Sequence, residues 1–324
     1  MMIDTKKDVR SILDMPYEVF KKEVHPQAKD VLIRHKDNQI TVSAMLAYNN
    51  VCKNNCAYCG MRAGNSGVNR YRIALDDVKR AANHAKSLGL TRLFLISGDD
   101  PKYAFEDILQ MVTYAKSLGL YVSMGIGELE HSLYDELAHA GLDEYVLKFE
   151  TSNKEYFKKI KPNTTYQKRM GCIEHIRSTS MQLASGNIVD MPGTSLDTLA
   201  DDIMLMKELE ISWAPIIPYM PVPHTPLAQE GGRGRVDLTL REIAILRLMM
   251  PTVNITAQQP GDNPKEGLGS VEGNLNALNC GANMLFVDLL PKDKVKDFSV
   301  IDNRMIEGMK HVERITQLAG MTKC

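Results

Sequence analysis

Three cysteines, Cys52, Cys56 and Cys59, lie within a span of eight residues and give the chain its clearest chemical signal. Thiolates are soft ligands that suit zinc and iron–sulfur clusters. A structural zinc site is closed by four ligands, and neither His25 nor His35 lies close in sequence. Three thiolates on a cube of four irons leave one iron free to bind a small molecule. The pattern therefore favours a [4Fe–4S] cluster over a zinc site completed by a distant residue and over buried cysteines that bind nothing.

The remaining cysteines, Cys172, Cys280 and Cys324, are scattered along the chain. Six cysteines in 324 residues do not make a disulfide framework, which is a feature of short secreted domains. Because the scattered cysteines form no group, the sequence offers no ligand set for a second cluster. We expect one cluster per chain.

A short repeat indicates the elements that position the cysteine loop. The segment 85–90 returns unchanged as 115–120, and each copy ends an amphipathic helix with glycine before a short apolar strand. A period of about thirty residues is typical of βα units in a parallel sheet. Strands are predicted at residues 41–47, 92–96, 121–126, 145–149, 182–189, 213–218, 252–257 and 283–287. Eight such units favour an α/β fold, a closed (β/α)8 TIM-type barrel.

The barrel is expected to form a single domain with additions at both ends. Residues 1–40 are charged and irregularly helical, which predicts an N-terminal helical extension. The barrel is assigned to residues 41–290. Residues 291–324 are assigned to a C-terminal helical segment that closes it.

Two segments near the end of the barrel carry loop and cap signals. The stretch 221–236 is rich in proline and glycine, which predicts a long loop at the rim of the barrel. Thr239 and Glu242 have the spacing of a capping box, which predicts that a helix begins at this point.

Composition and charge exclude several classes of function. Apolar residues make up 44% of the chain and charged residues 24%, as in ordinary globular proteins. A formal net charge of −1 offers no basic surface for nucleic acid or anionic lipid. No apolar run approaches the roughly 20 residues of a membrane span, and the N-terminus lacks the apolar core of a signal peptide. We expect a cytoplasmic protein without nucleic-acid or membrane partners.

With an aromatic residue, Tyr58, just before the last cysteine, the Cys-x3-Cys-x2-Cys motif resembles the signature of radical S-adenosylmethionine (SAM) enzymes. Its place directly after the first predicted strand is where that family carries it. More closely, the chain is similar to the biotin-synthase-like group that contains the [FeFe]-hydrogenase maturase HydE and the 3-methylornithine synthase PylB. The similar segments follow in consistent order at 51–65, 97–101, 127–128, 148–153, 169–172, 186–193, 221–227 and 280–283.

The resemblance implies cofactor contacts at the ends of the second and fourth predicted strands. Ser97, Gly98 and Asp99 match the turn whose backbone receives the SAM amino group. Glu150 matches a carboxylate that accepts hydrogen bonds from the ribose or the ammonium of SAM. Lys148 points the same way as Glu150 by strand alternation, so the two side chains are expected to pair and to face the site.

The same resemblance implies contacts for the other end of SAM. Arg169 matches the residue that binds the SAM carboxylate, a task that suits the bidentate guanidinium. Gly186 and Ile188 match the segment that contacts the adenine. Tyr219 lies in the segment expected to offer backbone atoms to the adenine edge, and Tyr58 of the cysteine motif is also assigned to the cofactor.

The substrate is expected to lie against the side of the barrel mouth that SAM leaves open. The candidate contacts there are Ser123, Glu128, Thr256, Gln258 and Gln259. Most of these side chains are neutral hydrogen-bonding groups, which is consistent with a small polar substrate.

As the resemblance implies, an external one-electron donor such as flavodoxin or ferredoxin reduces the cluster, and SAM is cleaved to methionine and a 5′-deoxyadenosyl radical. Three functions stay open. They are a HydE-like enzyme acting on a small organometallic or thiol-containing substrate, a PylB-like mutase that rearranges an amino-acid skeleton, and a non-enzymatic iron–sulfur carrier.

The chain departs from the family pattern at two points. Asp190 stands where the family often has glycine. Only Cys324 lies in the last forty residues, where some HydE sequences carry a group of cysteines.

Overall fold

Three helices precede the first strand in the computed structural model, which describes residues 3–324. They are α1 (Lys6–Asp14), α2 (Tyr17–Glu23) and α3 (His25–Lys36). A capping box opens α1, because the Asp8 N–H donates to Thr5 Oγ1 at 3.2 Å and the Thr5 N–H donates to Asp8 Oδ2 at 2.9 Å. Both α1 and α3 pack against α10 (Val236–Met249), and α1 also packs against α9 (Leu196–Glu208). The extension thus covers two of the barrel's own helices.

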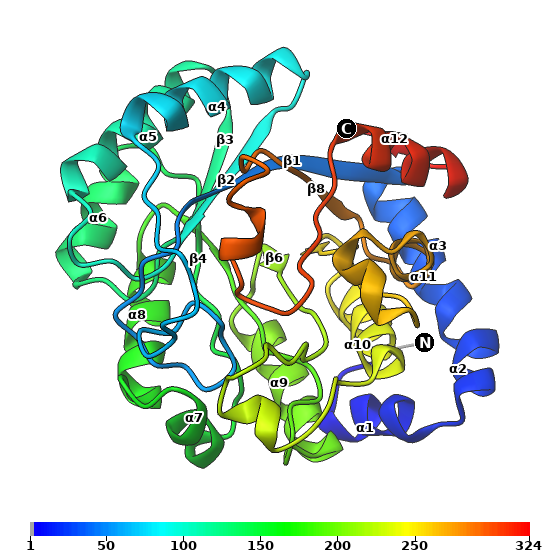
Figure 1. Cartoon of the computed structure of the whole chain (residues 1–324). Helices are drawn as coiled ribbons and strands as arrows, with labels where there is room; N and C mark the ends of the chain where they lie inside the picture. The colour runs from blue at the N-terminus through cyan, green and yellow to red at the C-terminus, as the bar shows by residue number, and fades with distance from the viewer. Residues whose placement is uncertain (1–2) are drawn as a thin grey trace.

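Eight parallel strands form the barrel (Figure 1). They are β1 (Gln39–Asn49), β2 (Arg92–Ser97), β3 (Tyr121–Gly125), β4 (Glu144–Val146), β5 (Gln182–Ala184), β6 (Trp213–Ala214), β7 (Asn254–Ile255) and β8 (Met284–Asp288). Neighbours follow chain order from β1 to β7, and β8 lies beside β1. The barrel closes between β7 and β8, where the Ala257 N–H donates to Met284 O at 2.8 Å and the Asn283 N–H to Ile255 O at 3.1 Å. The predicted (β/α)8 barrel is confirmed.

The strands from β4 to β7 are shorter than the sequence predicts. The ladders of β4 and β5 end at Val146 and Ala184, and only an isolated bridge between Glu150 and Asn187 continues their pairing. Glu150 has φ 67° and Asp190 has φ 56°, so the backbone leaves the extended conformation at the mouth of the barrel. The positive φ also gives a physical reason why glycine suits the position of Asp190.

The other helices surround the barrel (Figure 1). They are α4 (Leu75–Ser87), α5 (Phe105–Ser117), α6 (His131–His139), α7 (Lys154–Ile160), α8 (Tyr166–Ser178), α11 (Val271–Asn279) and α12 (Met309–Leu318). The repeated glycines follow α4 and α5 as predicted, with φ 75° at Gly89 and 72° at Gly119. This left-handed conformation ends a helix at little cost for a residue without a Cβ atom.

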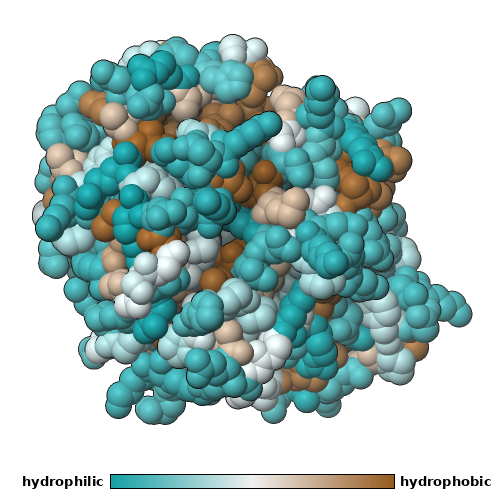
Figure 2. All heavy atoms as spheres, viewed as in Figure 1, coloured by the Kyte–Doolittle hydropathy of each residue, from teal (hydrophilic) through white to brown (hydrophobic). Residues whose placement is uncertain are grey.

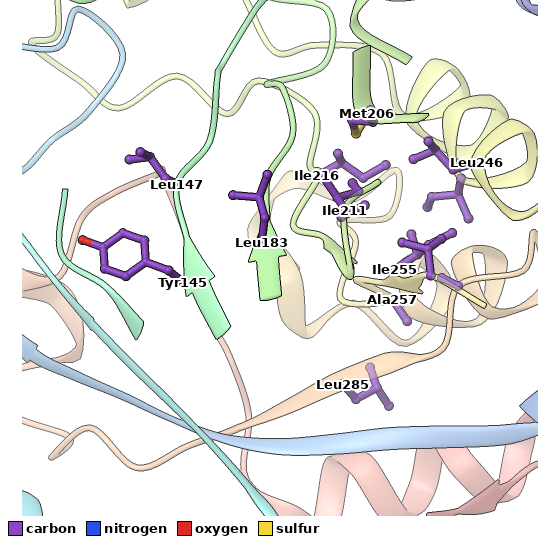
Figure 3. Close-up of a cluster of buried hydrophobic side chains, with 14 of the residues drawn as sticks. Tyr145, Leu147, Leu183, Met206, Ile211, Ile216, Leu246, Ile255, Ala257 and Leu285 are labelled. Carbon is purple, nitrogen blue, oxygen red and sulfur yellow. The ribbon is translucent and has the colours of Figure 1, made fainter. Parts of the chain in front are cut away.

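A hydrophobic layer fills the space between the barrel and α9 and α10 (Figure 3). Leu183, Ile216 and Ile255 come from the barrel, Met206 from α9 and Leu246 from α10, and all are buried. Burying an aliphatic side chain of this size contributes about 1.5–3 kcal/mol. Because the ladders of β5 to β7 are short, this packing holds their ends in place.

The helix predicted to begin at Thr239 begins earlier. α10 starts at Val236, with Arg235 at its N-cap, so Thr239 and Glu242 lie inside the helix and are fully buried. The predicted capping box is therefore wrong. The two polar side chains face the interior instead of capping a helix end, because α10 is buried along most of its length.

Two irregular segments lie over the mouth of the barrel. The segment 221–236 contains η1 (Leu227–Gln229), and the Leu227 N–H donates to Ala57 O at 3.0 Å. The segment 289–308 contains η3 (Val295–Asp297), the short orange helix at the centre of Figure 1. After α12 the chain ends in β9 (Thr322–Lys323), which pairs with the start of β1, so the C-terminal part is only partly helical.

The surface seen in Figure 2 is mainly hydrophilic, with hydrophobic residues visible in patches between polar ones. Among residues 3–324, every helix is too short or too polar to cross a membrane.

Candidate cluster and cofactor site

A cavity of about 240 Å³ lies at the carboxyl ends of the barrel strands. Its walls come from the loop after β1, the ends of β2 to β6, and residues 300–301 of the segment that contains η3. The predicted site residues that line it are Cys52, Cys56, Tyr58, Cys59, Ser97, Gly98, Asp99, Lys148, Glu150, Arg169, Ile188 and Tyr219. Residues separated by up to 167 positions in the sequence thus meet in one cavity.

Backbone hydrogen bonds hold the cysteine loop against other segments of the chain. The Lys53 N–H donates to Asp99 O at 2.8 Å, and the Ala57 N–H donates to Ile160 O at 2.8 Å. A side chain at Gly60 would collide with Ser299 O, 2.3 Å from an added Cβ, so the loop also packs directly on the segment 289–308. The cysteine positions are therefore fixed by the fold and not by the loop alone.

The three cysteines face the cavity as free thiols. Within residues 3–324, no three His, Cys, Asp or Glu side chains converge closely enough to hold a single metal ion. Burial raises the pKa of Cys52 and, with a further contribution from the neighbouring Cys56, raises the pKa of Cys59 to about 12. Iron binding would therefore release protons from the thiols.

Gly98 lets the end of β2 approach the cysteine loop. A Cβ atom at this position would lie 2.1 Å from Val51 O, a distance that no side chain tolerates. The carboxylate of Asp99 is also joined to the loop, accepting from Asn54 Nδ2 at 2.9 Å and pairing with Lys53 Nζ at 3.0 Å. The backbone oxygen of Gly98 already accepts from Ser97 Oγ at 2.7 Å. The turn that was assigned to the SAM amino group thus also anchors the cysteine loop.

Glu150 connects the cysteine motif to a partly buried lysine, Lys148. Tyr58 donates its hydroxyl to Glu150 Oε1 at 2.7 Å, and Lys148 Nζ lies 3.9 Å from Glu150 Oε2. The predicted pairing of Lys148 with Glu150 is confirmed, although β4 ends before both residues and strand alternation is not its cause. Burial lowers the pKa of Lys148, while the Glu150 charge opposes this effect.

Arg169 is already engaged by the protein. Its Nε donates to Glu128 Oε1 at 2.7 Å, and its Nη1 donates to the backbone oxygen of Lys148. Glu128 also accepts from Thr164 Oγ1 at 2.7 Å. Burial alone would raise the pKa of Glu128, but the Arg169 charge and the hydrogen bonds lower it overall. Glu128, predicted to contact the substrate, lines a neighbouring hollow instead and orients Arg169.

Two residues predicted to contact the adenine, Gly186 and Tyr219, also stabilise the fold. A Cβ atom at Gly186 would lie 3.1 Å from Ile216 Cγ2 and 3.5 Å from Met206 Sδ, so this glycine faces α9 and is absent from the cavity wall. The Tyr219 N–H donates to Val189 O at 2.8 Å, and Tyr219 O accepts from the Gly234 N–H at 2.8 Å. Ile188 and the Tyr219 side chain do line the cavity.

The other predicted substrate contacts do not reach the cavity. Ser123 donates to Glu144 Oε2 at 2.6 Å, and Thr256 accepts from Trp213 Nε1 at 2.9 Å. Gln258 exchanges two hydrogen bonds with the backbone of Phe286, at 2.8 and 3.1 Å. Gln259 donates to Ile216 O at 2.8 Å and Thr256 O at 3.0 Å. These side chains are buried, and each makes at least one hydrogen bond to a neighbouring side chain or to the backbone.

Sequence reasoning missed most of the apolar wall and one cation. Phe94 lines the cavity and contacts Trp213 and Phe286, with ring centroids 5.2 and 6.1 Å away, which closes the barrel interior. Lys161 lines the cavity with 7% of its surface exposed, and no side-chain partner is found for it in residues 3–324. Lys161 directly follows α7, and the last residue of α7, Ile160, accepts a hydrogen bond from the cysteine loop. No sequence motif indicates this location.

Comparison with known proteins gives consistent results. Residues 47–206 match the family model described as the radical SAM superfamily. The chain is 30% identical over 287 residues to the [FeFe] hydrogenase maturase subunit HydE of Thermotoga maritima, covering 89% of this chain and 81% of that protein. It is 24% identical over 321 residues to 3-methylornithine synthase of Methanosarcina acetivorans, covering 97% and 88%. The crystal structure of methylornithine synthase (PylB) superimposes with a TM-score of 0.84 at 22% identity, covering 99% and 94%.

Proposed function

Because the chain belongs to the radical SAM superfamily of enzymes, we propose that Cys52, Cys56 and Cys59 are the residues that hold its [4Fe–4S] cluster. The observation that supports the proposal is that all three thiols face one cavity without converging on a point suited to a single ion. A four-iron cluster binds each cysteine through a different iron, so its ligands need not converge on one point. Three thiolates leave the fourth iron for SAM.

The cavity walls fit the chemical groups of SAM. Glu150 offers carboxylate oxygens beside the cysteine loop, and Lys148, Lys161 and Arg169 supply positive charge for the SAM carboxylate. Ile188 and the ring of Tyr219 give an apolar surface for the adenine. We assign cofactor binding to this set, with Gly186 and Glu128 supporting it from outside the cavity wall.

When bound and reduced, the cluster supplies the electron that cleaves SAM to methionine and a 5′-deoxyadenosyl radical. The protein residues orient the cofactor and exclude water. Phe94, Ile96 and Val146 form an apolar floor, and Val300 and Ile301 of the segment 289–308 cover the cavity from above. An enclosed cavity suits a reactive primary radical, because it holds the radical beside the bound substrate and limits side reactions.

For the reaction itself we propose a HydE-like enzyme that acts on a small molecule and takes its electron from an external donor such as flavodoxin or ferredoxin. The 30% identity to a [FeFe] hydrogenase maturase subunit supports this assignment. The test is complementation of cells that lack HydE and make [FeFe] hydrogenase. Recovery of hydrogenase activity with this chain, but not with its Cys56→Ala variant, is expected, and no recovery with well-expressed, cluster-containing protein contradicts it.

A PylB-like reaction is the second candidate, supported by the likeness to 3-methylornithine synthase over nearly the whole chain. Cells that express the chain would then accumulate 3-methylornithine, which mass spectrometry detects. Its presence only with intact cysteines would favour this candidate over the first.

A separate assay tests SAM cleavage itself. The reconstituted protein, incubated with dithionite and SAM, is expected to form 5′-deoxyadenosine above the level of a Cys56→Ala control. Equal amounts from both proteins would contradict the enzyme assignment and favour an iron–sulfur carrier.

A further inference from the structure

The backbone of Glu150 needs support from its surroundings. Its φ of 67° is unfavourable for a residue with a side chain, and such a conformation persists only where neighbouring contacts enforce it. The Glu150 N–H donates to Gly186 O at 3.0 Å, and Glu150 O accepts from the Ile188 N–H at 3.1 Å. These bonds join Glu150 to residues 186–188, the segment assigned to the adenine. The two segments therefore need further contacts on the side that faces away from the cavity.

Asp202 of α9 holds both segments. Its side chain is buried, with the residue 4% exposed. One carboxylate oxygen accepts from the Ser152 N–H at 2.6 Å, and the other accepts from Asn187 Nδ2 at 3.2 Å. Ser152 follows Glu150 by two residues, and Asn187 is the bridge partner of Glu150. The Asp202 carboxylate therefore ties together the two segments that flank Glu150.

A second carboxyl group, Glu242 of α10, lies beside this junction. Glu242 is fully buried, and both of its Oε atoms lack a hydrogen-bond partner within the described chain. The Oδ1 atom of Asn187 also lacks one. Asn187 and Asp202 are among the groups that act on the Glu242 carboxyl. Acceptors that are buried together without a donor are costly, and one added proton supplies the missing donor.

Burial favours the protonated form of Glu242. It raises the pKa of Glu242 well above its usual range, with the Asp202 charge as the next contribution, whereas it raises the pKa of Asp202 to about 7. The Lys148 charge and the neighbouring Asn187 side chain oppose this effect, yet the ion-pair partner of Lys148 in the described residues is Glu150 and not Glu242. A neutral carboxylic acid can donate one hydrogen bond, whereas a carboxylate can donate none.

We propose that Glu242 is a neutral acid that donates its proton to Asn187 Oδ1, so that Asp202, Asn187 and Glu242 form a clamp that positions Glu150 and residues 186–188 for SAM. None of the three side chains belongs to the described cavity wall, so they are positioning residues. The inference rests on the proposed function, because it assigns Glu150 to the cofactor. It also explains why two acids, Asp202 and Glu242, are buried near the site although the cluster chemistry does not require them.

Replacing each acid by its amide distinguishes the two roles. Glu242→Gln keeps an N–H donor toward Asn187, so the dissociation constant (Kd) for SAM should stay within about threefold of wild type. Asp202→Asn places a donor where an acceptor is needed, and Glu242→Leu removes the donor. Each of these two variants should raise the Kd for SAM by about tenfold or more.

Glu144→Gln is the matched control. Glu144 is a fully buried carboxylate that accepts from the hydroxyls of Ser123 and Ser212, at 2.6 and 2.7 Å, away from the cavity. The change should lower the midpoint of thermal unfolding (Tm) without altering the Kd for SAM. Anaerobic calorimetry gives the Kd, and iron content with electron paramagnetic resonance (EPR) of the reduced cluster shows that each variant carries its cluster.

Two results would overturn the clamp while leaving SAM binding intact. In the first, Asp202→Asn and Glu242→Leu lower the Tm but keep the wild-type Kd, as the Glu144→Gln control does. In the second, Glu242→Gln weakens SAM binding as much as Glu242→Leu, which would mean that an ionised carboxylate is required. Failure of the cluster-containing wild type to bind SAM would overturn the proposed function, and the clamp with it.

Discussion

The two sides of the barrel mouth use their polar residues differently. On the side of β1 to β5, the three cysteines, Lys148 and Glu150 converge on one cavity. On the side of β6 to β8, the polar side chains near the strand ends bond to the fold itself. Gln258 exchanges both of its hydrogen bonds with the β8 backbone, and Thr256 accepts from Trp213.

The difference shows what kind of sequence signal predicts a site. Three cysteines within eight residues indicate a metal or cluster site, because packing alone does not require such spacing. Single polar residues on strands need partners once they are buried, and the fold supplies those partners first. The floor of the cavity is instead lined by apolar residues such as Phe94, Ile96 and Val146.

The largest expected effect comes from removing one cysteine. Cys56→Ala should lose the cluster, because two thiolates cannot hold it, and 5′-deoxyadenosine formation should fall to background. Iron content and anaerobic turnover measure both effects. Cys172→Ala, a buried cysteine outside the cavity wall, is the control and should keep the cluster. A Cys56→Ala protein that keeps full iron content would contradict the assignment of Cys56 to the cluster.

Glu150→Gln should have the next largest effect. The substitution removes the charge that pairs with Lys148 and accepts from Tyr58, and hydrogen bonds to a charged group correspond to about 10- to 100-fold in affinity. The Kd for SAM, measured by calorimetry on cluster-containing protein, should rise by that factor. The exposed Glu155→Gln on α7 is the control. Equal affinity in both variants would show that Glu150 does not contact the cofactor.

Tyr58→Phe should weaken SAM binding less, by about two- to tenfold, because one hydrogen bond to Glu150 is lost while the charge remains. Cluster content should be unchanged. The same calorimetry measures the effect, and a loss of the cluster in this variant would mean that Tyr58 supports the cysteine loop rather than Glu150.

Ser123→Ala should have the smallest functional effect of the four. Glu144 would lose one donor, which costs about 1–3 kcal/mol of unfolding free energy, while turnover and the Kd for SAM stay at wild-type values. Urea denaturation and the turnover assay measure the two quantities. Lost turnover with unchanged stability would return Ser123 to the substrate site.

The sequence predicted the barrel well, because the barrel depends on repeated local signals, and the residues assigned to the cofactor mostly line one cavity. The helix-ending glycines gave the βα period, and the cysteine spacing located the loop after β1. The physical reason why a particular residue stands at a site position was harder to predict. Gly98 was assigned to the SAM amino group, yet its lack of a side chain also admits Val51 O within 2.1 Å of an added Cβ.

What the sequence could not give depends on contacts between distant segments. Glu242 has the spacing of a capping residue, and only the packing of α10 against α9 shows that it is buried. Lys161 carries no motif, and its place beside the cysteine loop follows from the hydrogen bond between Ala57 and Ile160. Such residues become visible only when the fold brings their neighbours together.

The most direct test of the central claim is Mössbauer spectroscopy of the protein reconstituted with iron-57, with and without SAM. Cys52, Cys56 and Cys59 are predicted to hold one [4Fe–4S] cluster per chain, with one iron that lacks a cysteine ligand. Addition of SAM should change the signal of that one iron and leave the other three nearly unchanged. Four irons that do not respond to SAM, or a stoichiometric zinc ion in place of the cluster, would contradict the account.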